Sequence, residues 1–245
     1  MSLFINAPSV TPVKRFYSAL ELFLGGLLLI ALGALIPGLM ISKSNWATAA
    51  GVYGVIVFLT LTLWRAGPLG WANRVTLVRA VLVALVAGAL AGNAFVDAIW
   101  IWLCMAVVSL MLDGIDGFVA RRTHSHSRFG ARFDMELDAL MILLLCIGLV
   151  RLESLGVWVV LIGALRYAFV VAGWRLEWLA APLFPSFRRK TVCVWQVLAL
   201  LLSLTPLTSH TTAMLLALSA LVASVYSFGV DILWLYRQTR CPSSR

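Results

Sequence analysis

Four aspartates in one short segment give this sequence its clearest chemical signal. Asp113, Asp116, Asp134 and Asp138 stand close together in a chain of 245 residues that has only 10 acidic residues in all. Carboxylates gathered in an apolar setting repel one another strongly unless cations neutralise them. Oxygen ligands at this density suit Mg²⁺ or Mn²⁺, which usually keep water ligands and share the phosphate oxygens of a substrate. The segment therefore predicts a divalent metal site.

The spacing places these side chains on two helical faces. The first set, at positions i, i+3, i+4 and i+7, is Asp113, Asp116, Gly117 and Ala120. The second set, at positions i, i+4 and i+8, is Gly130, Asp134 and Asp138. Residues three or four apart share one face of a helix, so two such faces turned toward each other gather all four carboxylates. The small residues Gly117 and Ala120 leave room for a substrate to lie against the backbone.

The whole run resembles the signature of the CDP-alcohol phosphotransferase (CDP-alcohol phosphatidyltransferase) family. Written out, it is Asp113-x2-Asp116-Gly117-x2-Ala120-Arg121-x8-Gly130-x3-Asp134-x3-Asp138. Upstream, Asn73, Thr76 and Arg79 are similar to the family's Asn-x-x-Thr-x-x-Arg stretch, although Ala72 stands where a proline is usual. The resemblance spans about residues 70–237 and leaves out the first 65. Members of the family move a phospho-group from a CDP-activated lipid or alcohol to a hydroxyl acceptor.

The resemblance implies a role for each matching residue. Asp113, Asp116 and Asp134 bind two divalent cations, Mg²⁺ or Mn²⁺, on the pyrophosphate of the donor. Asp138, at the edge of the same metal cluster, deprotonates the acceptor. The residues expected to bind the CDP moiety are Asn73, Thr76, Asp113, Gly117, Ala120 and Arg121. The resemblance also implies a homodimer formed through core helices.

Composition independently assigns the chain to a membrane. Hydrophobic residues make up 62% of it and charged residues only 12%, a balance that a soluble domain cannot bury. Eight apolar stretches are each near the ~20 residues that cross a bilayer; they lie at about 17–41, 47–65, 75–95, 98–120, 132–151, 155–174, 190–206 and 211–236. We expect an all-α integral membrane protein with eight transmembrane helices, of which six form the family's core and two precede it.

Three segments follow from this pattern. Residues 1–66 hold two transmembrane helices of unknown role, residues 67–238 the six-helix catalytic domain, and residues 239–245 a basic cytoplasmic tail. A turn-prone Gly67-Pro68-Leu69-Gly70 separates the first two segments. In the first segment, Glu21 lies inside an apolar stretch; it can serve packing, reach the interface, or join an ion path or substrate gate. Asp231 in the last stretch raises the same question.

Basic residues set the expected orientation. They concentrate in alternate connections near residues 14–15, 65–79, 121–132, 175–190 and 237–245, whereas the opposite connections hold only Lys43 and Arg151. The positive-inside tendency then places both termini and the aspartates at the cytoplasmic face of the inner (cytoplasmic) membrane. The formal net charge of +9 reflects this topology and attraction to anionic lipid headgroups, so nucleic-acid binding is not needed to explain it.

Four basic residues bear on the acceptor. Arg166 lies in the middle of an apolar stretch, where a cation must face the protein interior or a wet cavity. With Arg188, Arg189 and Lys190 it can form an anion pocket, although a structural ion pair for Arg166 and an orientation signal for the other three explain them as well. On the anion-pocket interpretation, the donor CDP-diacylglycerol passes its phosphatidyl group to a phosphorylated polyol, glycerol 3-phosphate first and inositol phosphate second.

Other functions remain open at this point. An amino-alcohol acceptor, such as serine, choline or ethanolamine, would not need the basic cluster. Outside enzymes, an ion-coupled transporter also places carboxylates within a membrane, but it would not require Gly117, Ala120 and Gly130 at fixed offsets. His124 and His126 lie between the two halves of the motif and are best explained as part of a solvated loop, because the motif is complete without them.

Overall fold

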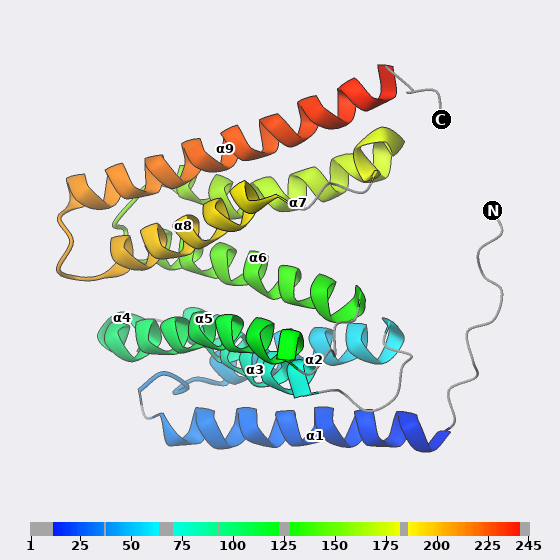
Figure 1. Ribbon diagram of the computed structural model, residues 1–245. Helices are drawn as coiled ribbons and strands as arrows, with labels where there is room; N and C mark the ends of the chain where they lie inside the picture. The colour runs from blue at the N-terminus through cyan, green and yellow to red at the C-terminus, as the bar shows by residue number, and fades with distance from the viewer. Residues whose placement is uncertain are drawn as a thin grey trace. The chain divides into compact units, whose positions relative to one another are not determined.

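The fold is helical throughout the part of the chain that the structure describes. The computed structural model describes residues 12–36, 38–63, 71–92, 94–122, 128–181 and 186–240, and no strand occurs in these ranges. The α-helices are α1 (Pro12–Leu35), α2 (Lys43–Leu63), α3 (Trp71–Leu90), α4 (Ala94–Asp97), α5 (Ile99–Arg122), α6 (Arg128–Arg151), α7 (Val160–Arg175), α8 (Phe187–Leu204) and α9 (His210–Arg240), with 3₁₀ turns η1 (Val157–Val159) and η2 (Glu177–Ala180) (Figure 1). The all-α prediction is confirmed for these residues.

Several helices are suited to a bilayer. Within the described ranges, four are long and apolar enough to cross it, namely Tyr17–Leu35, Lys43–Thr62, Val157–Arg175 and His210–Gln238, and Ile99–Ile115 is a shorter apolar helix. Their large apolar side chains are widely exposed, as Phe23 on α1, Phe58 on α2 and Leu215 on α9 illustrate. Exposed apolar surface on this scale is expected where lipid replaces water. The chain is therefore an integral membrane protein, and the further crossings stay a prediction.

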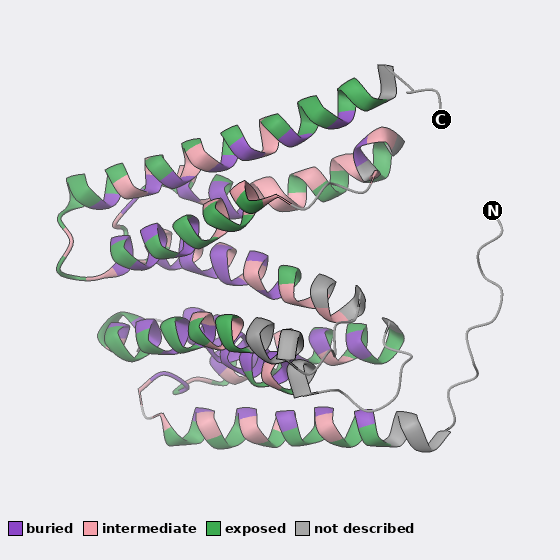
Figure 2. Ribbon diagram, in the orientation of Figure 1, coloured by how far each residue is buried: buried purple, intermediate pink, exposed green. Residues whose placement is uncertain are grey.

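The described helices belong to two compact units, Met1–Leu137 and Asp138–Arg245. In the first unit α3 is the central helix, because α1, α2 and α5 all pack against it. Every residue from Arg79 to Leu90 is buried, and Figure 2 shows this burial along the helix. From Ala80 to Leu90 the helix is apolar on all sides, which suits burial among other helices as well as contact with lipid. The expected segment boundaries at residues 66 and 238 stay predictions.

Polar contacts fasten α1 to its neighbours. Arg74, near the start of α3, donates to Glu21 Oε1 from Nε at 2.9 Å and from Nη2 at 2.6 Å. The Tyr53 hydroxyl on α2 donates to the Leu22 carbonyl at 2.6 Å. Gly25 allows this close approach, because a Cβ there would lie 2.2 Å from the Tyr53 hydroxyl. Glu21 is thus an ion-pair partner that links α1 to α3.

Asn45 fastens α2 to the last turn of α3. Its Nδ2 lies 3.0 Å from the Gly88 carbonyl and 3.3 Å from the Ala89 carbonyl, and it also reaches the Leu39 carbonyl at 3.1 Å. The Gly88 and Ala89 carbonyls also accept from backbone N–H groups in the closing turn, and the amide adds a second donor from a neighbouring element. A Cβ on Gly88 would lie 2.8 Å from the Ala49 Cβ, and glycine therefore lets the two helices meet at this point.

The second unit is built on the antiparallel pair α8 and α9. The helix α7 and the turn η2 pack against α9, where Phe169 meets Phe228 with ring centroids 5.5 Å apart and Trp178 meets Tyr236 at 5.9 Å. Gly163 on α7 lies directly against α6, because a Cβ there would be 2.8 Å from the Leu143 Cα. Close contact at small residues is the usual means of packing membrane helices, which gain no hydrophobic advantage from leaving lipid.

Replacing Asn45 should test the attachment of α2 to α3. The substitution Asn45→Ala removes the buried hydrogen bonds to the carbonyls of Gly88 and Ala89, each worth about 0.5–1.5 kcal/mol. We expect the thermal midpoint of the detergent-solubilised protein to fall by about 3–10 °C. Thr62→Ala is the control, because that exposed hydroxyl bonds only within α2 in the contacts described. Equal midpoints for the two variants would contradict the capping role.

Candidate metal centre

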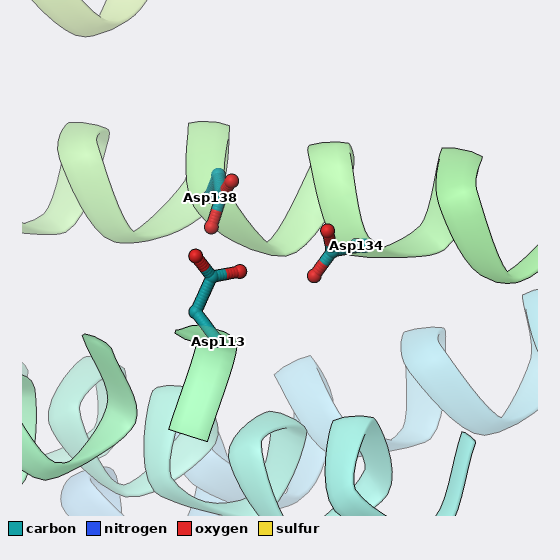
Figure 3. A group of neighbouring side chains, drawn as sticks. All are labelled: Asp113, Asp134 and Asp138. Carbon is teal, nitrogen blue, oxygen red and sulfur yellow. The ribbon is translucent and has the colours of Figure 1, made fainter. Parts of the chain in front are cut away.

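Two helices bring aspartates together. Asp113 lies on α5, and Asp134 and Asp138 lie one turn apart on α6. The division between the two compact units falls between Leu137 and Asp138, but α6 is continuous there, so Asp138 lies on the same helical face as Asp134. Each of the three side chains offers one carboxylate oxygen, and these oxygens all lie within 4.8 Å of one another. Figure 3 shows the three carboxyl groups pointing toward a common space. All three residues are partly buried.

The donor set fits a hard divalent cation. All three ligands are carboxylate oxygens, which Mg²⁺ and Mn²⁺ prefer over softer donors. Two oxygens bound to one Mg²⁺ are at most about 4.2 Å apart, and two ions of a paired centre stand about 3.5–4 Å apart. An oxygen spread of up to 4.8 Å is compatible with a pair of ions that share these ligands, or with one ion after a small side-chain rotation. The residues therefore suit the cations that the sequence predicts.

Arg79 is a member of this cluster that the sequence analysis did not assign to the site. Its Nη1 lies 2.7 Å from Asp113 Oδ1 and also pairs with Asp134 Oδ1. Only 2% of the Arg79 side chain is exposed, so this charge is compensated inside the protein. One signal was available in the sequence: an arginine inside an apolar stretch needs an acidic partner, and the chain has few acids to offer.

The remaining predicted ligands of metal and CDP are only partly described. Thr76 is buried on α3, one turn before Arg79. The backbone of the others belongs to α3 or α5, but their side chains lie outside the described residues; they are Asn73, Asp116, Gly117, Ala120 and Arg121. Their predicted roles stay predictions, as do the roles of the three clustered aspartates.

The predicted acceptor residues belong to the second unit, where two of them share an acid. Arg188 pairs with Asp231 on α9, donates from Nη1 to the Ser227 carbonyl at 3.0 Å, and lies over the Tyr226 ring at 5.9 Å from its centroid. Arg189 Nη1 lies 3.7 Å from the second oxygen of Asp231. Asp231 thus orients two arginines at once, a structural role that the sequence analysis left open.

The other two predicted acceptor residues differ in exposure. Arg166 is half-buried on α7, whereas Lys190 is exposed on the first turns of α8. Both are in the second unit with Arg188 and Arg189. A role in binding an acceptor stays a prediction for all four.

Removing one carboxylate should weaken metal binding. Asp134→Asn deletes a charge from a cluster of three ligands, and we expect the affinity for Mn²⁺ to fall by about 10–100-fold. The measurement is the amount of free Mn²⁺ in a titration of the solubilised protein, followed by electron paramagnetic resonance. Glu136→Gln is a matched control, because it removes the same charge from an exposed position on the same helix. A loss as large in Glu136→Gln would show that only the total charge matters.

Comparison with known proteins shows the family to which the chain belongs. The family model for CDP-alcohol phosphatidyltransferase matches residues 69–226, which include α3, α5 and α6 with all four signature aspartates. Comparison with curated proteins and with solved structures gives no significant match. The match covers well over half of the chain and bears out the resemblance found in its sequence. The chain belongs to the CDP-alcohol phosphatidyltransferase family.

Proposed function

We propose that the protein moves the phosphatidyl group of CDP-diacylglycerol to a hydroxyl acceptor and releases CMP. Family membership implies transfer from a CDP-alcohol to an acceptor, and it supports group transfer rather than ion-coupled transport. The observation that carries the proposal is the cluster of Asp113, Asp134 and Asp138, whose oxygens lie close enough to share bound cations. This arrangement suits a substrate whose reactive group is a pyrophosphate.

In the proposed mechanism, each aspartate has a defined task. Asp113, Asp116 and Asp134 hold two divalent cations, Mg²⁺ or Mn²⁺, which when bound neutralise the pyrophosphate and favour departure of CMP. Asp138 takes the proton of the acceptor hydroxyl. The acceptor oxygen then forms a bond to the lipid-side phosphorus while the bond from that phosphorus to the CMP oxygen breaks. Direct transfer is favoured over a covalent enzyme intermediate, since the signature fixes no Ser, Cys or His.

The nucleotide and the membrane complete the proposal. Residues on α3 and α5 bind the CDP moiety: Asn73, Thr76, Asp113, Gly117, Ala120 and Arg121. Eight helices cross the inner membrane, and the aspartates and both termini face the cytoplasm. The lipid tails remain between helices while the polar groups react at the membrane border. The protein acts as a homodimer.

For the acceptor we favour a phosphorylated polyol, with glycerol 3-phosphate first and inositol phosphate second. Arg188 and Arg189 both contact Asp231, which fixes their orientation, and the planar guanidinium group is well suited to bind a phosphate. Arg166 and Lys190 add positive charge to the same unit. An amino-alcohol acceptor is the alternative, and it would make no use of these four bases.

Asp138→Asn should abolish CMP release. The amide cannot accept the acceptor's proton, whereas Asp113 and Asp134 still supply metal ligands, so Mn²⁺-dependent binding of CDP-diacylglycerol should remain measurable. The assay measures CMP released from CDP-diacylglycerol with Mg²⁺ or Mn²⁺ and a panel of acceptors. Glu136→Gln should release CMP at the wild-type rate. Turnover retained in Asp138→Asn would exclude Asp138 as the base, and a wild-type protein that releases no CMP with any acceptor would contradict the proposed transfer.

Arg189→Gln should identify the class of acceptor. If the acceptor carries a phosphate, its KM should rise about 10–100-fold, since a charge-assisted hydrogen bond is lost. The KM for serine or ethanolamine should not change. Arg237→Gln, an exposed change of the same charge on α9, serves as the control. An equal loss with phosphorylated and unphosphorylated acceptors would reject the proposed phosphate contact.

A further inference from the structure

The position of Arg79 carries an inference about how the metal centre is assembled. We propose that Arg79 is an internal counter-cation, which holds Asp113 and Asp134 together before a divalent ion binds and then yields their oxygens to that ion. The inference rests on the proposed metal-binding function of the aspartates. It makes Arg79 a positioning residue, because its task is to prepare the ligands.

The geometry places one nitrogen where a cation is needed. Arg79 Nη1 pairs with Oδ1 of Asp113, 2.7 Å away, and with Oδ1 of Asp134. These carboxylates come from different helices, α5 and α6, and both belong to the group of three that can hold a metal ion. A single positive group therefore bridges two predicted metal ligands.

Burial explains why the bridge is needed. The Arg79 side chain is 2% exposed, and the side chains of Asp113 and Asp134 are 30% and 34% exposed. Two carboxylates this near each other and partly shielded from water repel strongly, so without a cation they would separate. Arginine is suited to the task because it stays protonated in proteins. It cannot release the carboxylates by losing its charge, and the oxygens must pass to the incoming ion by a change of partner.

The scaffold keeps Arg79 in place. It begins the fully buried part of α3, which α1, α2 and α5 surround. Arg74, five residues earlier, pairs with Glu21 on α1, and Asn45 on α2 caps the far end of the same helix. Because these contacts hold α3 at both ends, the backbone of Arg79 is held where its guanidinium reaches both Asp113 and Asp134.

Thermal unfolding of the full-length solubilised protein, in EDTA and in saturating Mn²⁺, tests the proposal. Arg79→Gln should unfold at a lower temperature than the wild type in EDTA, because Asp113 and Asp134 then repel without compensation. Mn²⁺ should close more than half of this gap. The variant should also bind Mn²⁺ at least about threefold more tightly, since no internal cation competes for the oxygens, and binding to the folded state alone raises its stability.

Two further variants make the result specific. Arg74→Gln removes a charge from the same helix outside the cluster, and it should lose as much stability in Mn²⁺ as in EDTA. Arg79→Gln combined with Asp113→Asn removes both members of one pair and relieves the repulsion. The double variant should therefore unfold at a higher temperature in EDTA than Arg79→Gln, and it remains informative if the single variant does not fold.

The outcomes separate this proposal from the function on which it rests. A wild-type midpoint for Arg79→Gln in EDTA, or a loss of the same size with and without Mn²⁺, would overturn the counter-cation role. So would a double variant no more stable than Arg79→Gln. A wild-type protein whose unfolding and Mn²⁺ titration show no response to the ion would instead overturn the metal centre, while recovery in the double variant would still support the pairing of Arg79 with the acids.

Discussion

Charge compensation inside an apolar protein is the constraint on which this structure depends. The chain has only 10 acidic residues, and the described ion pairs use four of them to hold arginines from distant parts of the sequence. Where water is scarce, an unpaired charge costs several kcal/mol, so each such acid fixes the place of its partner. At Arg79 the constraint coincides with the chemistry, because the acids that neutralise it are also the predicted metal ligands.

The central helix α3 connects the two N-terminal helices to the reaction. The helices α1 and α2 pack against α3, where Leu77 lies near Gly25 of α1. The same helix places Arg79 against Asp113 and Asp134. A helix without a solvent face can hold a reactive group accurately, since packing on all sides limits its motion. Among the described residues, α1 and α2 thereby contribute to the order of the centre through their packing against α3, and the three clustered ligands come from α5 and α6.

Sequence patterns predicted the local features of this protein better than its long-range contacts. Apolar length located the helices α5 and α6, and the i, i+4 spacing of Asp134 and Asp138 predicted one shared face, because both depend on neighbouring residues alone. The pairing of Arg79 with Asp134 and of Arg188 with Asp231 spans 55 and 43 residues. Such pairs depend on how the helices pack. The sequence offers several acids and bases, and their positions along the chain do not indicate which of them form an ion pair.

The family match begins at residue 69, between the helices that Asn45 and Gly88 join. A protein trimmed to the matching range would keep every signature aspartate, yet the last turn of α3 would lose the hydrogen bonds that the Asn45 amide donates to the Gly88 and Ala89 carbonyls. The family match therefore begins later in the chain than the unit in which α3 is packed. Comparisons with other members of the family should therefore treat α1 and α2 as part of the folded unit that contains α3.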